Sequence, residues 1–221
     1  MARTTGAVLG KQSGRIGQVY GALVHGEQVY RAMPAKPKKT DLDRIPSEVL
    51  DRREKFKTLV QLAKAFKPAA DIGFDNYRWV KPFISPFNYF VKVNKNAVYV
   101  MGGEAEVDYG SLLCAQGSLA PAGFGNAVFT NPQEVSVTYA TTSDMPSSDA
   151  QDKVYMFLYQ PDTKQAILSA SSLRTTGTLA VHVPASWVGL TVHCYGFAIG
   201  DGRDTKGLVS DSSYIGTGII G

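Results

Sequence analysis

Apolar residues recur at helical spacing in one stretch of the N-terminal third of the chain. Ser47 follows Pro46 as a helix cap, and Glu48 stands where a negative charge favours the helix dipole. The pair Lys67-Pro68 ends the helix, because a proline disfavours helical conformation in the preceding residue. The apolar positions of this predicted helix are Phe56, Leu59, Val60, Ala63 and Phe66. Its outer face is basic, at Arg52, Arg53, Lys55, Lys57, Lys64 and Lys67.

A second, shorter helix is predicted from Ser85-Pro86 to about Asn94. Serine is a preferred cap residue, and proline is favoured at the first helical position. Its apolar positions are Tyr89, Phe90 and Val93.

From about Asn96 the apolar period changes to two, which is typical of β-strands. Strands are predicted over 135–139, 153–160, 179–183 and 190–199, the last of them pairing with 208–215 in a closing hairpin. Turn-rich spacers separate the strands, at 141–152, 160–162, 175–177, 184–186 and 200–207. Short strands with regular turns predict a mainly β fold, an antiparallel β-sandwich of the immunoglobulin or fibronectin kind.

The first thirty residues are rich in irregularly spaced glycine and contain a repeated tripeptide. Gln18-Val19-Tyr20 recurs as Gln28-Val29-Tyr30, and His25-Gly26 lies between the copies as a turn signal. A β-hairpin is therefore predicted over 17–32. Because an isolated hairpin is marginal in water, it must lie on the rest of the protein or on a neighbouring subunit.

The segment 34–43 has the composition of an extended linker and is the most basic short run, with Lys36, Lys38 and Lys39. The predicted organisation is a glycine-rich hairpin arm with its basic linker at 1–46, a helical segment at 47–95 and a β-sandwich domain at 96–221.

Charge is distributed unevenly along the chain. Residues 1–68 hold 14 Lys and Arg against 6 Asp and Glu, whereas residues 69–221 hold 9 against 13. Such asymmetry suits a basic arm that meets nucleic acid or an acidic surface, or that joins unlike ends of neighbouring copies. A solvated basic face without a partner explains it equally well. No stretch reaches the roughly 20 uncharged apolar residues of a membrane helix, and Arg3, Lys11 and Arg15 interrupt any signal-peptide core. We expect synthesis in the cytoplasm without membrane insertion, followed by residence in a virion or other assembled particle.

Residues with catalytic or metal-binding chemistry are few, and each has a structural explanation. His182 and His193 lie within alternating strands, where a histidine is usually a face-lining side chain. The loop Gly200-Asp201-Gly202-Arg203-Asp204 weakly suggests calcium but lacks the spacing of an EF-hand. Ser210-Asp211-Ser212-Ser213 contains nucleophile-type residues without an assignable base. Cys114 and Cys194 are expected as buried thiols, with a disulfide between strands as the alternative. No catalytic, cofactor or metal site is assigned, and the chain is expected not to be an enzyme.

Both ends of the chain carry motifs that resemble a known group of proteins. They are Ala2-Arg3-Thr4-Thr5-Gly6 with Leu9-Gly10-Lys11, the run from Ser13 to Val19, Arg31 before Pro34, and the closing segments 192–197 and 209–216. Together they are similar to an uncharacterised family, a domain of unknown function common in Bacteroidota and their phages. The resemblance implies no established catalytic activity, and a virion role for its phage members.

Three functions remain open. The preferred one is a structural protein of a virion or other large assembly, a homo-oligomer or a partner of other structural proteins. The others are a binding module whose sandwich loops recognise a protein or glycan, and, less favoured, a nucleic-acid-associated protein. The residues expected at subunit or partner contacts are Gly17, Val19, Tyr20, Val29, Tyr30, Arg31, Lys36, Lys38 and Lys39.

Overall fold

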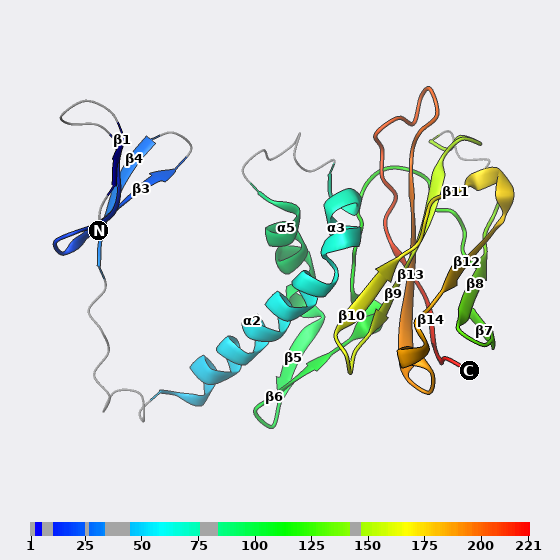
Figure 1. Cartoon of the computed structure of the whole chain (residues 1–221), viewed down its shortest axis with the longest axis horizontal. Coiled ribbons are helices and arrows are strands. Elements are labelled where there is room, and N and C mark those ends of the chain that lie inside the picture. The colour runs from blue at the N-terminus through cyan, green and yellow to red at the C-terminus, as the bar shows by residue number, and fades with distance from the viewer. Residues whose placement is uncertain (1–2, 6–10, 25–26, 34–44, 76–83, 142–146) are drawn as a thin grey trace. The chain divides into compact units, whose positions relative to one another are not determined.

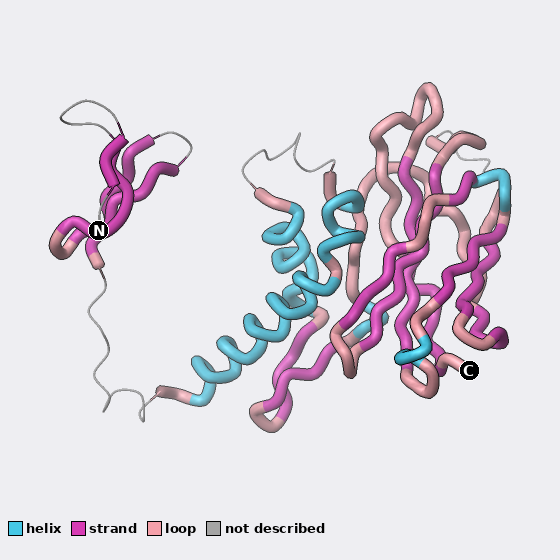
Figure 2. The backbone as a smooth tube through the Cα atoms, in the orientation of Figure 1, coloured by secondary structure: helices cyan, strands magenta, loops and turns pink. Residues whose placement is uncertain are grey.

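The computed structural model describes residues 3–5, 11–24, 27–33, 45–75, 84–141 and 147–221. The chain divides into two compact units, Met1–Pro46 and Ser47–Gly221. Antiparallel strands are the main element of both units (Figure 1), and the second also contains helices (Figure 2). The prediction of a mainly β fold with helices is confirmed.

The N-terminal unit contains a four-stranded antiparallel sheet in which each strand pairs with the next along the chain. Its strands are β1 (Arg3–Thr5), β2 (Lys11–Ile16), β3 (Val19–Val24) and β4 (Glu27–Ala32). The predicted hairpin is present as β3 and β4, with Val24 opposite Glu27, while its predicted turn residues His25 and Gly26 lie outside the described residues. The sequence did not predict β1 and β2, because glycines interrupt any alternation there. Gly17 joins β2 to β3 with a φ of +61°, which favours glycine.

The helices of the second unit are α2 (Ser47–Ala65), α3 (Lys67–Gly73) and α5 (Pro86–Val93). α5 confirms the short helix together with its cap, since the N–H of Asn88 donates to Ser85 Oγ at 3.2 Å. α2 confirms the long helix but already includes Ser47, which was expected to precede it. The chain then continues into α3, which the sequence reading missed. Pro68 lies in the first turn of α3, where its missing N–H leaves no helical hydrogen bond unmade.

Only the second half of α2 is packed into the protein. Leu59, Leu62 and Ala63 are buried, whereas Phe56 is 59% exposed. Phe56, an apolar position of the predicted helix, is thus not part of the core, because it lies one turn before the first buried position of the helix.

A five-stranded antiparallel sheet forms the centre of the second unit. Its strands are β9 (Lys153–Gln160), β10 (Gln165–Leu168), β11 (Ser172–Leu173), β13 (Thr191–Ile199) and β14 (Ser213–Ile219). The order is β10-β9-β13-β14, with β11 also paired to β9. The predicted closing hairpin of 190–199 with 208–215 is present, but its second strand runs beyond the predicted end: Thr191 lies opposite Ile219, and Gly196 opposite Ser213. Before β14, Val209 forms an isolated antiparallel bridge with Ile199, and the Ser210 N–H donates to the Ala198 carbonyl.

Two smaller sheets complete the second unit. β7 (Val128–Asn131), β8 (Glu134–Thr138) and β12 (Thr178–His182) form one in the order β12-β8-β7. β5 (Val98–Met101) and β6 (Glu104–Val107) form a separate hairpin.

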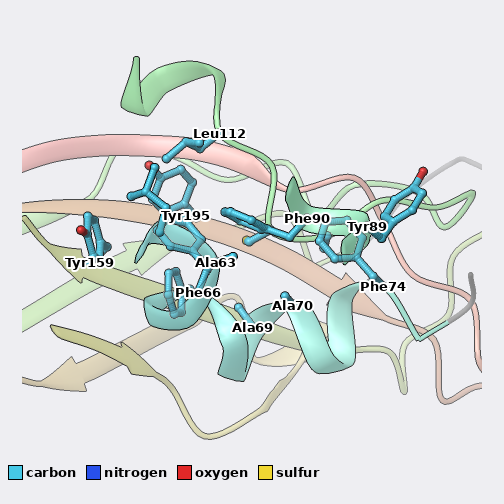
Figure 3. Close-up of a cluster of buried hydrophobic side chains, with 14 of the residues drawn as sticks. Ala63, Phe66, Ala69, Ala70, Phe74, Tyr89, Phe90, Leu112, Tyr159 and Tyr195 are labelled. Carbon is cyan, nitrogen blue, oxygen red and sulfur yellow. The ribbon is translucent and has the colours of Figure 1, made fainter. Parts of the chain in front are cut away.

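The central sheet is covered on both faces. On one face Phe157 and Tyr195 pack against Phe66 of the helical region, with ring centroids 4.7 and 5.4 Å from it; Figure 3 shows this helix-side core. On the other face Met156 and Cys194 pack with side chains of β8 and β12 and with Trp187, in a sheet-side core. Residues of the predicted segments 47–95 and 96–221 thus share the helix-side core, and the three-part division of the chain stays a prediction.

A buried ion pair lies at one end of the central sheet. Arg174 and Asp152 are 1% and 0% exposed, and Arg174 Nε lies 3.6 Å from Asp152 Oδ2. A guanidinium nitrogen also donates to the carbonyl of Ala120 at 2.7 Å. Asp152 accepts from Thr205 Oγ1 at 2.7 Å and from the Asp149 N–H at 2.8 Å. Because each charged group holds a different loop, the pair fixes several loops at once.

Replacing Arg174 by methionine is expected to lower the free energy of unfolding by about 3–5 kcal/mol, because Asp152 would remain as a buried carboxylate without its cation. Arg203→Met, at an exposed arginine of the neighbouring loop, is the matched control and should change stability by less than about 0.5 kcal/mol. Urea unfolding followed by tryptophan fluorescence measures both. Equal midpoints for the two variants would contradict the assigned role of the pair.

Candidate functional site

The sheet of the N-terminal unit contains most residues expected at partner contacts. Tyr20 and Tyr30 are 50% and 55% exposed, and Arg31 is also exposed. Val19 and Val29 are partly buried, and Gly17 lies in the turn before β3. The remaining predicted contact residues, Lys36, Lys38 and Lys39, lie outside the described residues.

The register of the sheet divides these residues between two faces. Tyr20 lies directly opposite Arg31 on β4 and opposite Arg15 on β2, so the three side chains form one cross-strand row. We call the face with Arg15, Tyr20, Ala22, Val29 and Arg31 the basic face. The other face of the sheet carries Val19, Leu23 and Tyr30.

The sequence reading missed Arg15, although a signal was present. Gly17-Gln18 between the β-type runs Arg15-Ile16 and Val19-Tyr20 fits a two-residue hairpin turn. That turn places Arg15 opposite Tyr20, as the structure shows.

The two histidines in the described part of the chain, His182 and His193, do not form a catalytic arrangement with a nucleophile. His182 is exposed at the end of β12, and His25 lies outside the described residues. His193 is half-buried, and its Nδ1 is hydrogen-bonded to the Tyr214 hydroxyl at 2.9 Å. Its ring stacks on Tyr109 with a centroid distance of 4.0 Å. Desolvation lowers the pKa of His193, so its neutral form packs between aromatic rings.

The serine-rich motif 210–213 binds a segment of backbone that we call the strap, residues 113–119. The Cys114 N–H donates to Ser212 Oγ at 3.0 Å, and the Gly117 N–H donates to Asp211 Oδ1 at 3.0 Å. Ser210 is fully buried, and its Oγ accepts from the Ala198 N–H at 2.8 Å. Ser210, Asp211 and Ser212 of this motif are thus engaged in structural hydrogen bonds.

The buried Asn94 holds the start of the strap. Its side-chain amide donates to the Leu113 carbonyl at 2.8 Å, and its Oδ1 accepts from the Leu113 N–H at 2.7 Å. This two-way contact joins the end of α5 to the strap.

The loop considered for calcium is occupied by other contacts. Asp201 pairs with Lys153 at 2.8 Å, and the Gly202 N–H donates to Thr205 Oγ1. Within the described ranges, no group of three or more His, Cys, Asp or Glu residues is placed to hold a metal ion. The same ranges contain no helix long and apolar enough to span a membrane.

Cys114 and Cys194 are buried free thiols. Burial raises the pKa of each from its ordinary value of 9.0 to about 12. The folded state therefore binds the two thiol protons more tightly than the unfolded state does. This contribution to stability is complete below about pH 9 and is lost as the pH rises toward about 12.

We expect the urea midpoint of the protein to fall as the pH is raised from about 8 to about 11, because the unfolded chain then loses thiol protons that the folded chain keeps. The double variant Cys114→Ala with Cys194→Ala should show a shallower fall. Some fall should remain in this variant, because burial also raises the pKa of Tyr159 to about 12. Urea titrations at several pH values measure both effects. A flat profile for the wild-type protein would contradict the assignment.

Comparison with known proteins identifies a family but no described activity. A search of curated proteins finds no match to the chain. Residues 11–216 match a family of unknown function (DUF6266), and this range includes both the basic face and the strap. The chain therefore belongs to this family of unknown function.

Proposed function

We propose that the protein is a non-catalytic structural component of a virion or other large assembly, and that its N-terminal unit makes the contacts between subunits. The observation that carries this proposal is the sheet of residues 3–32. It exposes Tyr20 and Val24 on one face, and Leu23 and Tyr30 on the other. A sheet normally buries at least one face against a second layer. Within 1–46, the described residues provide no such layer, so a partner surface that covers the sheet would stabilise it.

The non-catalytic part of the proposal is supported by the packing and hydrogen bonding of the side chains that could act as bases or nucleophiles. His193 is packed between Tyr109 and Tyr214, and the buried Ser210 accepts a hydrogen bond from the Ala198 N–H through its Oγ. Desolvation raises the pKa of both cysteine thiols, which disfavours the reactive thiolate.

We further propose that the sheet-side core corresponds to an immunoglobulin- or fibronectin-like sandwich. Two antiparallel sheets share this core, with Trp187 fully buried in it. The helices on the opposite face of the central sheet are an addition to that architecture.

A loop-based binding module is the second candidate function, and one observation favours it. Thr205 of the 200–207 loop hydrogen-bonds to Asp152, the last residue of the 141–152 loop. Loops held together by a buried ion pair offer a fixed surface to a protein or glycan. Nucleic-acid binding is less favoured, because Arg52 and Lys57 on α2 already pair with Glu48 and Glu54 of the same helix.

Deletion of residues 1–46 is expected to convert a discrete oligomer into a monomer, because it removes the exposed sheet. Light scattering of the purified full chain and of residues 47–221, at several concentrations, measures this change. Tyr20→Ser with Tyr30→Ser should weaken association without deletion. Phe56→Ser is the matched control, since it removes an exposed aromatic side chain from α2 instead. A full chain that remains monomeric at every concentration would contradict the proposal.

A further inference from the structure

The hairpin formed by β5 and β6 has one face toward the core and one toward solvent. Val98 is buried in the helix-side core, with Ala105 and Val107 packed against it. The outward positions carry two exposed apolar side chains, Tyr99 (43%) and Met101 (63%). Opposite them on β6 stand Glu106 and Glu104, respectively. We call these four residues the acidic face.

The carboxylates of this face have no basic partner among the described residues. Neither Glu104 nor Glu106 forms an ion pair there. Other surface carboxylates do: Asp201 pairs with Lys153, and Asp71 pairs with Lys67. The hydrogen bond and the negative charge of Glu106 raise the pKa of Tyr99, with a smaller contribution from Asp108. Unpaired negative charge therefore surrounds an exposed aromatic ring.

The hairpin itself is well defined by its sequence. Gly102 and Gly103 both have positive φ, +62° and +87°, as the first and second residues of a type I′ turn require. A two-residue turn fixes the register, so that Tyr99 faces Glu106 and Met101 faces Glu104. The side chains of the acidic face are thus presented on a regular two-stranded surface.

The basic face of the N-terminal unit is the counterpart of this surface. It presents Arg15 and Arg31 on either side of the exposed Tyr20, and neither arginine forms an ion pair within the described part of the chain. Both surfaces are antiparallel sheet faces with an aromatic ring beside charged groups of one sign. Arg15 and Arg31 lie two strands apart, about 10 Å, and Glu104 and Glu106 lie two residues apart along β6, about 7 Å, a difference that long, flexible arginine side chains can span.

We infer that the basic face of one copy of the chain docks on the acidic face of a second copy, with Arg15 and Arg31 meeting Glu104 and Glu106 while Tyr20 packs on Tyr99 and Met101. This inference rests on the proposed assembly function and names the surface that the N-terminal unit recognises. The two faces differ, so the contact is head-to-tail, and repetition builds a ring or an open chain of subunits. The contact weakens with salt because its charges lie near solvent.

Charge reversal on the full-length chain tests the inference. Arg15→Glu with Arg31→Glu, and separately Glu104→Lys with Glu106→Lys, should each raise the dissociation constant for self-association by roughly 100-fold or more, because like charges would then face each other. Arg52→Glu with Arg53→Glu on the exposed face of α2 is the matched control and should leave association unchanged. Sedimentation equilibrium measures all three. The decisive result is rescue: a chain with all four reversals, or a mixture of the two reversed chains, should associate again.

The outcomes separate this inference from the proposed function. If deletion of residues 1–46 abolishes association but reversal at Glu104 and Glu106 does not, the subunits assemble through another surface and the inference is wrong. If the wild-type chain never associates, both the function and the inference are wrong. The third outcome is a chain that is monomeric at every concentration and whose residues 1–46 become protease-sensitive when the charges of either face are reversed. The docking would then occur within one copy, and the inference would be overturned.

Discussion

Burial of both faces of β9 and β13 is the constraint on which the second unit depends. Successive residues of these strands, such as Met156 and Phe157, point to opposite sides of the central sheet, and both are completely buried. A second sheet alone would leave the aromatic side in water, and helices alone would leave the other side uncovered. Two different covers are therefore required, and the helices with the β5–β6 hairpin supply one while β7, β8 and β12 supply the other.

Covering a sheet on both sides forces connecting segments to run between layers, and their polar groups must still be paired. The strap solves this problem with side chains from distant elements, since Asn94, Asp211 and Ser212 all bind its backbone. The ion pair of Arg174 and Asp152 does the same for the loops at one end of the sheet. In both arrangements the buried side chains of Asn94, Arg174 and Asp152 form hydrogen bonds with backbone groups of the segments that they hold.

Sequence pattern predicted the features that neighbouring residues determine. The cap at Ser85 and the pairing of β3 with β4 are local, and both are confirmed. The closing strand continues to Ile219, beyond its predicted end at Ile215, and local pattern could not predict the contact of Asp211 with Gly117, 94 residues away in the strap. In the candidate site the repeated Val-Tyr pairs predicted the hairpin that carries Tyr20 and Arg31, and the structure adds that these two residues face each other. Arg15 was missed because its position depends on a third strand that glycines concealed.

The strap also bears on how freely this sequence can change. Asn94 and Ser212 contact its main chain, so a change of side chain at the partly buried Leu113 leaves those hydrogen bonds intact, whereas at the completely buried Cys114 the new side chain must also fit the helix-side core. Substitution of the contacting residues, by contrast, orphans buried backbone groups. Substitution should thus be tolerated least at the polar positions that hold the strap and at Gly117, where an added Cβ would meet the Val209 carbonyl, and best at exposed strap positions such as Ser118. A signature of this architecture is then better sought in a few separated Asn, Ser and Asp residues than in any continuous stretch of the interior.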